Sequence, residues 1–359
     1  MDNLTHSLFG LTLAQTPLRR AGRGTTLALV LASNVPDSDI VVALTGGRAA
    51  YLSGHRGSSH GPLGVVALAA ATATLVYGST IWQQRRAARA NPQVGSASTY
   101  ASFLSLVGVA LIGTLGHVLM DLPTPYGTRS LSPFAPSWYA LDWMPIIDIS
   151  LLGILSVGLM SVWFRPRLRT PIAAAVFLLI AANYDLRAEL HAAALRQVMS
   201  DSGNIPGTLS AWPDAPSPKL PTDHRCPQAP CAVTTAAIPT FGSPFRWRIV
   251  REFSNGYRLS DLNLLDHAES PIGWLPHEDG PPVQAAREAP IARTFLAFSR
   301  FPAAHITRAG QDAIVEIRDA RFLDVPISRR SEEFRPGGFF RVFVRLDPHG
   351  TILEDRFAN

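Results

Sequence analysis

Acidic residues are scarce in the first half of this sequence. Residues 1–182 hold six of the 27 acids of the 359-residue chain, and none of the six is a glutamate. Charged residues make up 16% of the whole chain, compared with about 25% in an average soluble domain. The deficit excludes a single soluble domain and predicts an apolar first half joined to a polar second half. The six acids are Asp2, Asp37, Asp39, Asp121, Asp142 and Asp148.

Lysine and cysteine are also scarce. Lys219 is the only lysine, so the net charge of +5 rests on arginines. Several arginines cluster between apolar segments, where they orient membrane helices, and we expect no nucleic-acid partner. Cys226 and Cys231 are not spaced as CxxC and have no second pair, which argues against a cysteine-based zinc knuckle. They form either a disulfide or two free thiols.

Long uncharged runs predict membrane helices, which need roughly 20 apolar residues. Segments 62–82, 99–120 and 145–164 have this length and contain only His117 and Asp148 as ionisable residues. Segment 171–184 is apolar but shorter. Segments 4–16 and 25–35 are shorter still, and we interpret them as a helical hairpin that is half buried in the membrane or packed on the bundle.

Arginine clusters follow the first short helix and the first and third long segments. If each apolar segment crosses or turns back in order, all three clusters fall on one side, which the positive-inside rule makes the cytoplasm. The four histidines of this half and five of its six acids then lie at the extracytoplasmic face. The arginines are Arg19, Arg20, Arg23, Arg85, Arg86, Arg89, Arg165, Arg167 and Arg169.

The second half of the sequence has a different pattern. Nine prolines lie between residues 205 and 244, which is typical of a linker. Strand patterns follow at 247–251, 257–262, 313–317, 339–347 and 351–357, with turn residues between paired strands. We therefore predict an α-helical integral membrane bundle over 1–194, a proline-rich linker over 195–244, and a small, mainly β, soluble domain over 245–359.

Four motifs bring histidine and aspartate to the predicted extracytoplasmic face. His117 and Asp121 are four residues apart at the end of a span and so share one helix face. Ionisable groups at such a place are costly and usually functional. The other motifs are His6 in the first short helix, Asp37 and Asp39 after the helix-ending Pro36, and His55 and His60 around a Gly-Ser stretch.

Imidazole and carboxylate ligands together suit zinc, with manganese or iron as alternatives. The number of candidate ligands exceeds what one zinc ion takes, so we predict one to three ions. Such clusters generate hydroxide and clamp phosphoryl oxygens, and Arg56 and Arg129 in the same loops match phosphate geometry. The sequence has no Walker or GxGxxG motif for a rival chemistry.

These motifs, in this order, resemble the YdjM-like membrane-bound metal-dependent hydrolases of bacteria. The resemblance covers residues 1 to about 150 and implies an inner-membrane location and hydrolase activity. The matching residues are Met1, Thr5, His6, Gly10 and the segments 35–39, 55–60, 116–121, 124–127, 131–134, 142–143 and 146–148. More loosely, the set is similar to the zinc-dependent phospholipase C and single-strand nuclease superfamily, whose leading tryptophan is missing here; this puts a terminal-amine ligand in doubt.

We therefore predict a multi-pass, metal-dependent phosphoester hydrolase at the outer face of the cytoplasmic membrane, acting on a phospholipid or lipid-linked substrate. The predicted metal ligands are His6, Asp37, Asp39, His55, His60, His117 and Asp121. The predicted catalytic or supporting residues are Arg56 and Arg129, for the phosphoryl charge, with Asp142 and Asp148. The alternatives are a non-enzymatic membrane protein with a structural metal, a metal carrier, or an assembly factor that works through its soluble domain.

Overall fold

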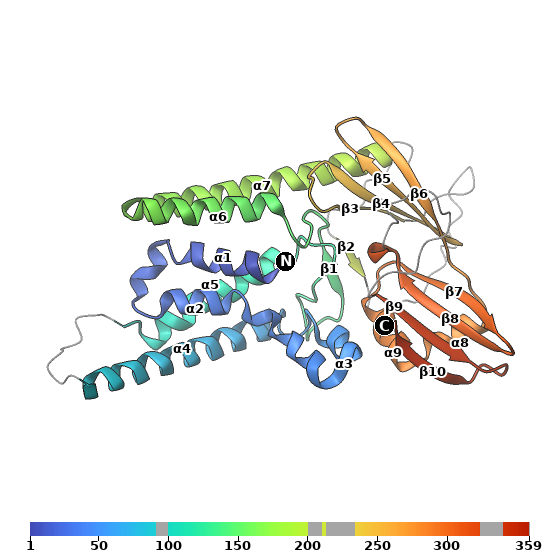
Figure 1. Cartoon of the computed structure of the whole chain (residues 1–359), viewed down its shortest axis with the longest axis horizontal. Coiled ribbons are helices and arrows are strands. Elements are labelled where there is room, and N and C mark those ends of the chain that lie inside the picture. The colour runs from blue at the N-terminus through green and yellow to red at the C-terminus, as the bar shows by residue number, and fades with distance from the viewer. Residues whose placement is uncertain (91–99, 200–209, 213–233, 324–339, 359) are drawn as a thin grey trace. The chain divides into compact units, whose positions relative to one another are not determined.

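The computed structural model describes residues 1–90, 100–199, 210–212, 234–323 and 340–358 (Figure 1). The chain divides into two compact units. The first consists of Met1–Val41 and Gly54–Ala188, and the second of Val42–Ser53 and Glu189–Asn359. The first unit is mainly helical, and the described part of the second contains the antiparallel sheets, as the sequence predicted for the fold class.

The chain begins with the predicted helical hairpin. Helix α1 (Asn3–Leu13) is capped by the side chain of Asp2, which accepts a hydrogen bond from the Thr5 amide. A 3-10 turn, η1 (Pro17–Ala21), leads to Gly24, whose left-handed φ of 96° precedes α2 (Thr25–Ala32). A second 3-10 turn, η2 (Val35–Ile40), has Pro36 as its second residue and carries Asp37 and Asp39.

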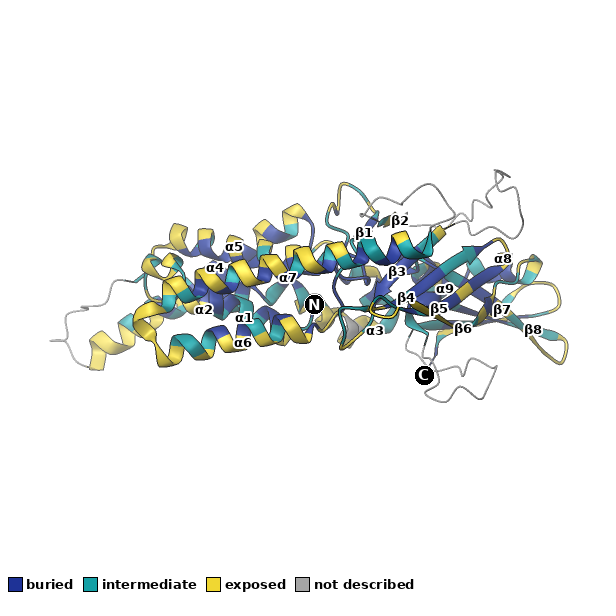
Figure 2. Ribbon diagram, turned by 90° about the horizontal axis from the view of Figure 1, so that it is seen from above, coloured by how far each residue is buried: buried dark blue, intermediate teal, exposed yellow. Residues whose placement is uncertain are grey.

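Among the residues that the structure describes, three helices are long and apolar enough to cross a membrane. They are α4 (Pro62–Ala90), α5 (Phe103–Asp121) and the segment Pro166–Val198, which contains the short turn η3 (Pro166–Leu168) and α7 (Arg169–Val198). Strand β1 (Trp138–Ala140) and α6 (Ile149–Phe164) lie between α5 and α7. Much of the surface of these helices is exposed (Figure 2). The exposed residues include large apolar ones such as Leu75 (66% exposed) and Leu178 (73%), as expected for lipid-facing surfaces.

The lengths of two predicted spans differ from the expectation: the third long segment is shorter than predicted, and the short segment after it is longer. The segment predicted at 145–164 forms α6 only from Ile149, because the Asp148 side chain caps the helix there. With 16 residues, α6 falls below the length of a full span. The segment predicted at 171–184 continues as α7 to Val198, because its sequence beyond the apolar run remains free of proline and glycine.

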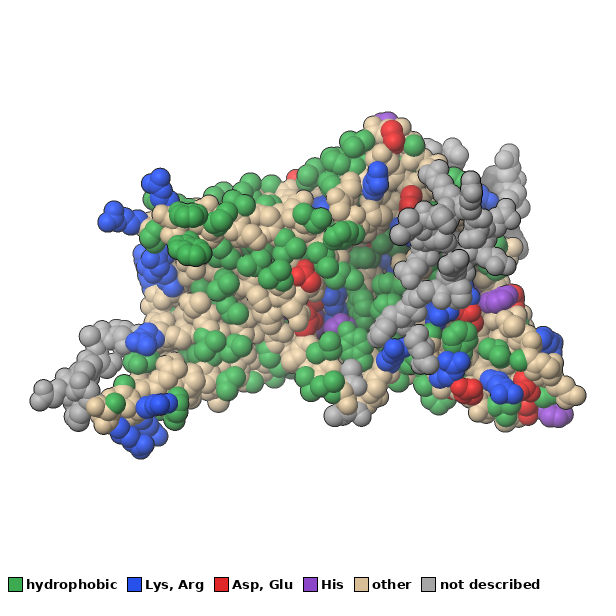
Figure 3. All heavy atoms as spheres, in the orientation of Figure 1, with side chains coloured by type: hydrophobic (Ala, Val, Ile, Leu, Met, Phe, Trp, Pro, Cys, Tyr) green, Lys and Arg blue, Asp and Glu red, His purple; other side chains and the backbone are tan. Residues whose placement is uncertain are grey.

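Close packing of small residues builds the centre of the helical unit. Ala32, Ala69 and Ala110 form one buried cluster, and a Cβ added to Gly113 would meet the Ala32 side chain at 2.7 Å. Small residues of this kind let helices approach closely. The basic side chains gather at one end of these helices, the left end in Figure 3, in agreement with the arginine partition expected from the sequence.

Two four-stranded antiparallel sheets lie in the described part of the second unit. One has the order β3-β4-β5-β6 and the other β10-β9-β8-β7. The bounds are β3 Thr234–Pro239, β4 Arg246–Phe253, β5 Gly256–Asn263, β6 Ala268–Pro276, β7 Pro302–Ala309, β8 Asp312–Asp319, β9 Arg341–Leu346 and β10 Ile352–Phe357. The remaining elements are α3 (Val41–Gly54), β2 (Ser210–Trp212), α8 (Pro281–Arg287), α9 (Pro290–Phe298) and η4 (Ala320–Phe322).

The strands predicted from alternation are present as β4, β5, β8, β9 and β10. The sequence missed β3, β6 and β7, whose prolines and small residues hide the alternation, and it missed α8 and α9. The predicted linker lies largely outside the described residues, as do Cys226 and Cys231. The domain limits at 194 and 244 therefore remain predictions.

Candidate metal centre

Four side chains of the helical unit place a ligand atom around one point. The Nε2 atoms of His60 and His117 are 3.2 Å apart. The His117 Nε2 atom is also 3.4 Å from Asp37 Oδ1 and 3.4 Å from Asp121 Oδ2. The His60 Nε2 atom is 3.7 Å from Asp37 Oδ1 and 3.3 Å from Asp121 Oδ2. Two ligands at about 2.0–2.1 Å from a tetrahedral zinc ion would be separated by about 3.3 Å, so these spacings fit such an ion.

The hydrogen bond of His117 fixes which of its nitrogens faces this point. Its Nδ1 atom is 2.8 Å from the carbonyl oxygen of Ser33. A carbonyl only accepts hydrogen bonds, so Nδ1 carries the proton and Nε2 presents a lone pair to the centre. Metal-bound histidines are typically oriented in this way by the partner of the other nitrogen.

His60 is oriented through a chain of two hydrogen bonds. The Ser59 hydroxyl donates to Asp39 Oδ2 at 3.0 Å, and the Ser59 oxygen is 2.9 Å from His60 Nδ1. The hydroxyl proton is used on the carboxylate, so His60 Nδ1 donates to Ser59 and Nε2 carries a lone pair. The two Nε2 lone pairs of His60 and His117 therefore face each other, an arrangement that a shared cation would stabilise.

Among the described residues, two groups of side chains have the spacing of metal ligands. One is His6, Asp37, His117 and Asp121, and the other is Asp37, Asp39 and His55; within each group the ligand atoms lie within 4.8 Å of one another. His60 belongs to neither group, although its Nε2 atom lies beside His117, Asp37 and Asp121. Asp37 belongs to both groups, so its carboxylate is placed to join two ions. The Asp39 carboxylate accepts a hydrogen bond from the Arg56 amide at 2.9 Å. Its other oxygen is 2.8 Å from His55 Nδ1, and this contact orients the His55 ring.

His6 is buried without a hydrogen-bond partner on either ring nitrogen. Buried polar groups are nearly always paired, so each exception calls for an explanation. The His6 ring stacks on that of His117 with centroids 3.9 Å apart, and its Nε2 atom is 3.4 Å from Asp121 Oδ1. A metal ion would supply the missing partner, as the sequence predicted for this residue.

The amino group of Met1 also reaches the centre. It is buried and contacts Asp121 Oδ1. Burial lowers the pKa of this amino group well below its ordinary value, with a further contribution from Arg56. The sequence comparison had put a terminal-amine ligand in doubt because the leading tryptophan is missing. The tertiary structure, which the sequence does not reveal, places the Met1 amino group beside Asp121.

The protonation states of the side chains at the centre favour metal binding. Burial alone would raise the pKa of Asp37, but the surrounding hydrogen bonds and charges, including that of Arg56, bring it below its ordinary value. Burial lowers the pKa of His60 well below its ordinary value, with His117 and Arg56 contributing. An ionised carboxylate and a neutral imidazole are the forms that bind metals.

Arg56 lies against the ligands. Its Nη2 atom is 3.1 Å from Asp121 Oδ1, and its Nη1 atom donates to Thr124 Oγ1 at 2.9 Å. The guanidinium group lies 4.9 Å from the centre of the Tyr126 ring. Its backbone has a left-handed φ of 50°, a conformation that is uncommon for a non-glycine residue and often marks functional sites. The sequence identified Arg56, and Thr124 and Tyr126 lie in a segment that matched the resemblance without a role, but Ser33 carried no recognisable signal.

The other predicted site residues lie outside both ligand groups. Arg129 lies 5.0 Å from the centre of the Trp138 ring, and its amide donates to the Arg56 carbonyl at 2.9 Å. Asp142 is buried on the segment between β1 and α6. Asp148 caps α6 and pairs with Arg187 of α7, an ion pair that joins these two helices. Catalytic roles for these three residues remain predictions.

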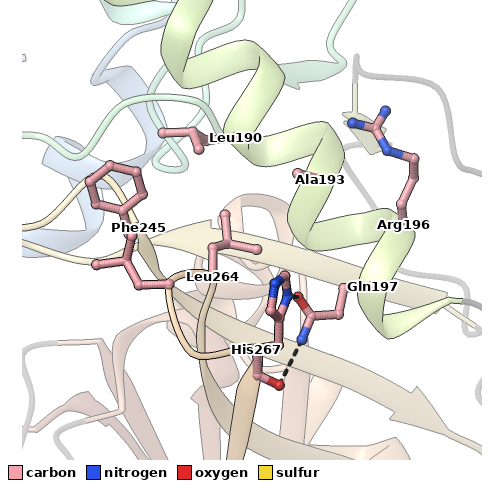
Figure 4. A pocket seen from close by; sticks show the side chains of 8 residues that line it. Leu190, Ala193, Arg196, Gln197, Phe245, Leu264 and His267 are labelled. Carbon is pink, nitrogen blue, oxygen red and sulfur yellow. Dashed lines mark hydrogen bonds between the residues drawn. The ribbon is translucent and has the colours of Figure 1, made fainter.

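A cavity of about 400 Å³ in the second unit offers a contrasting environment (Figure 4). Its lining is mainly apolar and contains no acidic residue. Gln197 and His267 hydrogen-bond to each other across it, at 2.9 Å between the amide nitrogen and the His267 carbonyl. Nothing in this lining matches a metal-dependent hydrolase. The lining residues are Leu190, Ala193, Arg196, Gln197, Phe245, Leu264, Leu265 and His267.

Comparison with known proteins shows which family the chain belongs to. The family model of the YdjM inner membrane protein matches residues 1–191. The chain belongs to this family. The match covers the whole metal centre and confirms the resemblance seen in the sequence, and membership places the chain in the inner membrane.

One curated relative is the uncharacterized protein YfhP of Bacillus subtilis. It is 26% identical over 172 residues, which cover 46% of this chain and 46% of YfhP. The chain therefore spans about half the length of this relative. No solved structure matches the chain.

Proposed function

We propose that this family member is a metal-dependent hydrolase that cleaves a phosphoester at the extracytoplasmic face of the inner membrane. The observation that carries the proposal is the set of ligand atoms from His60, His117, Asp37 and Asp121, in which the Nε2 atom of each histidine lies 3.2–3.7 Å from the other and from both carboxylates. The orientation of both histidines by hydrogen bonds to their Nδ1 atoms supports it further.

The donor chemistry fits one to three divalent ions, with zinc favoured and manganese or iron as alternatives. His60, His117, Asp37 and Asp121 would hold the first ion. Asp39 and His55, with Asp37 shared, would hold a second, and His6 is placed at Asp121 for a third. When bound, ions of this kind supply a hydroxide nucleophile at neutral pH and neutralise phosphoryl oxygens.

The residues of the chain would orient the substrate. The Arg56 guanidinium, held by Asp121 and Thr124, provides positive charge beside the ligands for the phosphoryl oxygens. In the reaction, water adds to phosphorus, the bond from phosphorus to the leaving oxygen breaks, and that oxygen takes up a proton. Because the ligands lie at helix ends, a phospholipid or lipid-linked phosphoester is the substrate class that the site favours.

The position of the ligands also bears on the alternatives. A transporter binds its ion near the bilayer midplane, whereas His117 and Asp121 occupy the last turn of α5. The arginines at the opposite helix ends favour an extracytoplasmic site by the positive-inside rule. A structural metal remains the second candidate, because buried ligands such as His6 and His117 would hold an ion without any reaction.

Two measurements test the proposal. Elemental analysis of detergent-purified protein should give roughly one to three zinc-like ions per chain, and His117→Ala should lose them. A content below about a tenth of an ion, after exposure to zinc and manganese, would contradict a metal site. In a screen of phospholipids and chromogenic phosphate esters, chelator-sensitive cleavage that depends on His60 supports the hydrolase. Metal without any such cleavage supports the structural metal.

A further inference from the structure

An ordered turn beside the metal centre exposes two large apolar side chains. Residues 129–135 follow α5 and are closed by hydrogen bonds from the Phe134 and Ala135 amides to the Leu131 carbonyl, at 2.9 and 3.0 Å. Phe134 is 72% exposed and Leu131 is 46% exposed. A turn held in this way cannot easily bury these side chains by folding back, so the exposed apolar surface needs an occupant.

Contacts with the histidine loop fix the position of this turn. The Arg129 amide donates to the Arg56 carbonyl, and a Cβ on Gly57 would lie 2.6 Å from Arg129 Nη2. A Cβ on Gly61 would collide with the Ser132 carbonyl. The turn therefore packs directly on the backbone of the loop that carries His55 and His60.

The same contact gives the depth of the turn in the membrane. Gly61 immediately precedes Pro62, the first residue of the span α4. On the first turns of α4, Leu63 and Val66 are 57% and 59% exposed and apolar, as lipid-facing residues are. The uncharged run 62–82 is about 31 Å long at 1.5 Å per residue, close to the thickness of the hydrocarbon core. Its start therefore marks the membrane boundary.

We infer that the 129–135 turn is a membrane anchor whose Leu131 and Phe134 side chains insert into the outer leaflet. The contact of Gly61 with Ser132 places this turn beside the first turn of α4, so the bilayer that covers Leu63 and Val66 is the occupant that the structure favours. The anchor holds the histidine loop at the level of lipid phosphates. Insertion itself does not rest on the proposed hydrolase function, although it would deliver lipid substrates to that site from the bilayer.

Spin labels in lipid nanodiscs test the insertion directly. Cys226→Ser and Cys231→Ser remove the native thiols, and Phe134→Cys then takes the label. Leu75→Cys, on the exposed middle of α4, is the lipid-facing reference. Phe241→Cys is the matched control, because Phe241 is a 68% exposed aromatic residue on a turn of the second unit.

Collision rates with oxygen, which concentrates in lipid, and with a polar nickel chelate give the result. The label at position 134 should favour oxygen, as the label at 75 does, while the label at 241 favours the chelate. A chelate preference at 134 would overturn the insertion. Shielding from both reagents would also overturn it, because the occupant would then be protein, such as a second copy of the chain.

Activity provides an independent readout if the protein hydrolyses phosphoesters. Phe134→Ser should raise the apparent KM for an ester in vesicles roughly ten-fold, as expected for the loss of one inserted aromatic side chain. The kcat, the hydrolysis of a short-chain soluble ester, and the metal content should stay unchanged, as should all four in Phe241→Ser. An equal rise of KM for both ester forms would contradict delivery from the bilayer, whereas a lack of all activity would count only against the hydrolase.

Discussion

Buried charge is handled differently in the two units of this protein. In the β-sheet unit, Asp319 accepts hydrogen bonds from the Ser299 hydroxyl at 2.9 Å, the Arg300 amide at 3.0 Å and the Arg321 guanidinium at 2.7 Å. In the helical unit, Asp121 contacts the Arg56 guanidinium and the Met1 amino group, but its other neighbours are imidazole nitrogens, and His6 among them has no hydrogen-bond partner. A saturated buried carboxylate stabilises a fold, whereas an unsatisfied set of ligands indicates a binding site.

Removing a carboxylate from the helical set should have the largest effect. We expect Asp121→Ala to abolish metal binding, because Asp121 approaches four other groups of the centre. Asp142→Ala should only weaken it, because Asp142 lies outside both ligand groups. The measurement is metal content after purification, with circular dichroism to confirm that both variants are folded. Equal retention of metal in the two variants would contradict the ligand assignment.

In the β-sheet unit, the matching change should affect stability and leave metal binding intact. We expect Asp319→Ala to lower the free energy of unfolding of this unit by ~3–5 kcal/mol, because Arg321 would remain buried without its partner. Asp261→Ala removes the partner of Arg248 at a half-exposed position and should cost no more than about 1 kcal/mol. Denaturant unfolding gives both values, and similar losses would show that Asp319 is no more important than a surface acid.

The pair also gives the β-sheet unit a pH dependence. Burial alone would raise the pKa of Asp319, but the Arg321 charge and hydrogen bonds bring it below its usual value of about 3.9. A carboxyl group with a lowered pKa stabilises the fold above its unfolded pKa, and this stability is lost as the pH falls through the folded value. Wild type should therefore lose stability below about pH 4 more steeply than Asp319→Asn, and parallel curves would exclude this contribution.

The smallest change concerns a hydroxyl group behind the metal ligands. Ser59 connects Asp39 to His60, so Ser59→Ala should leave the ligands in place but less well oriented. Loss of such a partner typically lowers metal affinity by about 10–100-fold. Ser58→Ala is the control, because the neighbouring Ser58 is exposed. Competition titration with a chelating dye measures both affinities, and equal affinities would mean that His60 is oriented by its packing alone.

Composition and periodicity alone determined much of this protein. The small number of acids before residue 183 and the uncharged runs predicted the helical membrane part, because a bilayer requires long apolar helices. Alternation predicted β4, β5 and β9, since a half-buried strand repeats every two residues. The i, i+4 spacing of His117 and Asp121 placed both on one helix face, because that relation depends on helix geometry alone.

Only the tertiary structure decided how the ligands meet. His6, Asp37, His60 and His117 lie on four different segments, and their spacing depends on packing between helices that no local pattern encodes. The same holds for the Ser33 carbonyl that orients His117 and for the Met1 amino group at Asp121. Asp148 belongs to the same sequence pattern as the ligands, yet it caps α6 and pairs with Arg187, because the partner of a buried charge is set by whichever segment folds against it.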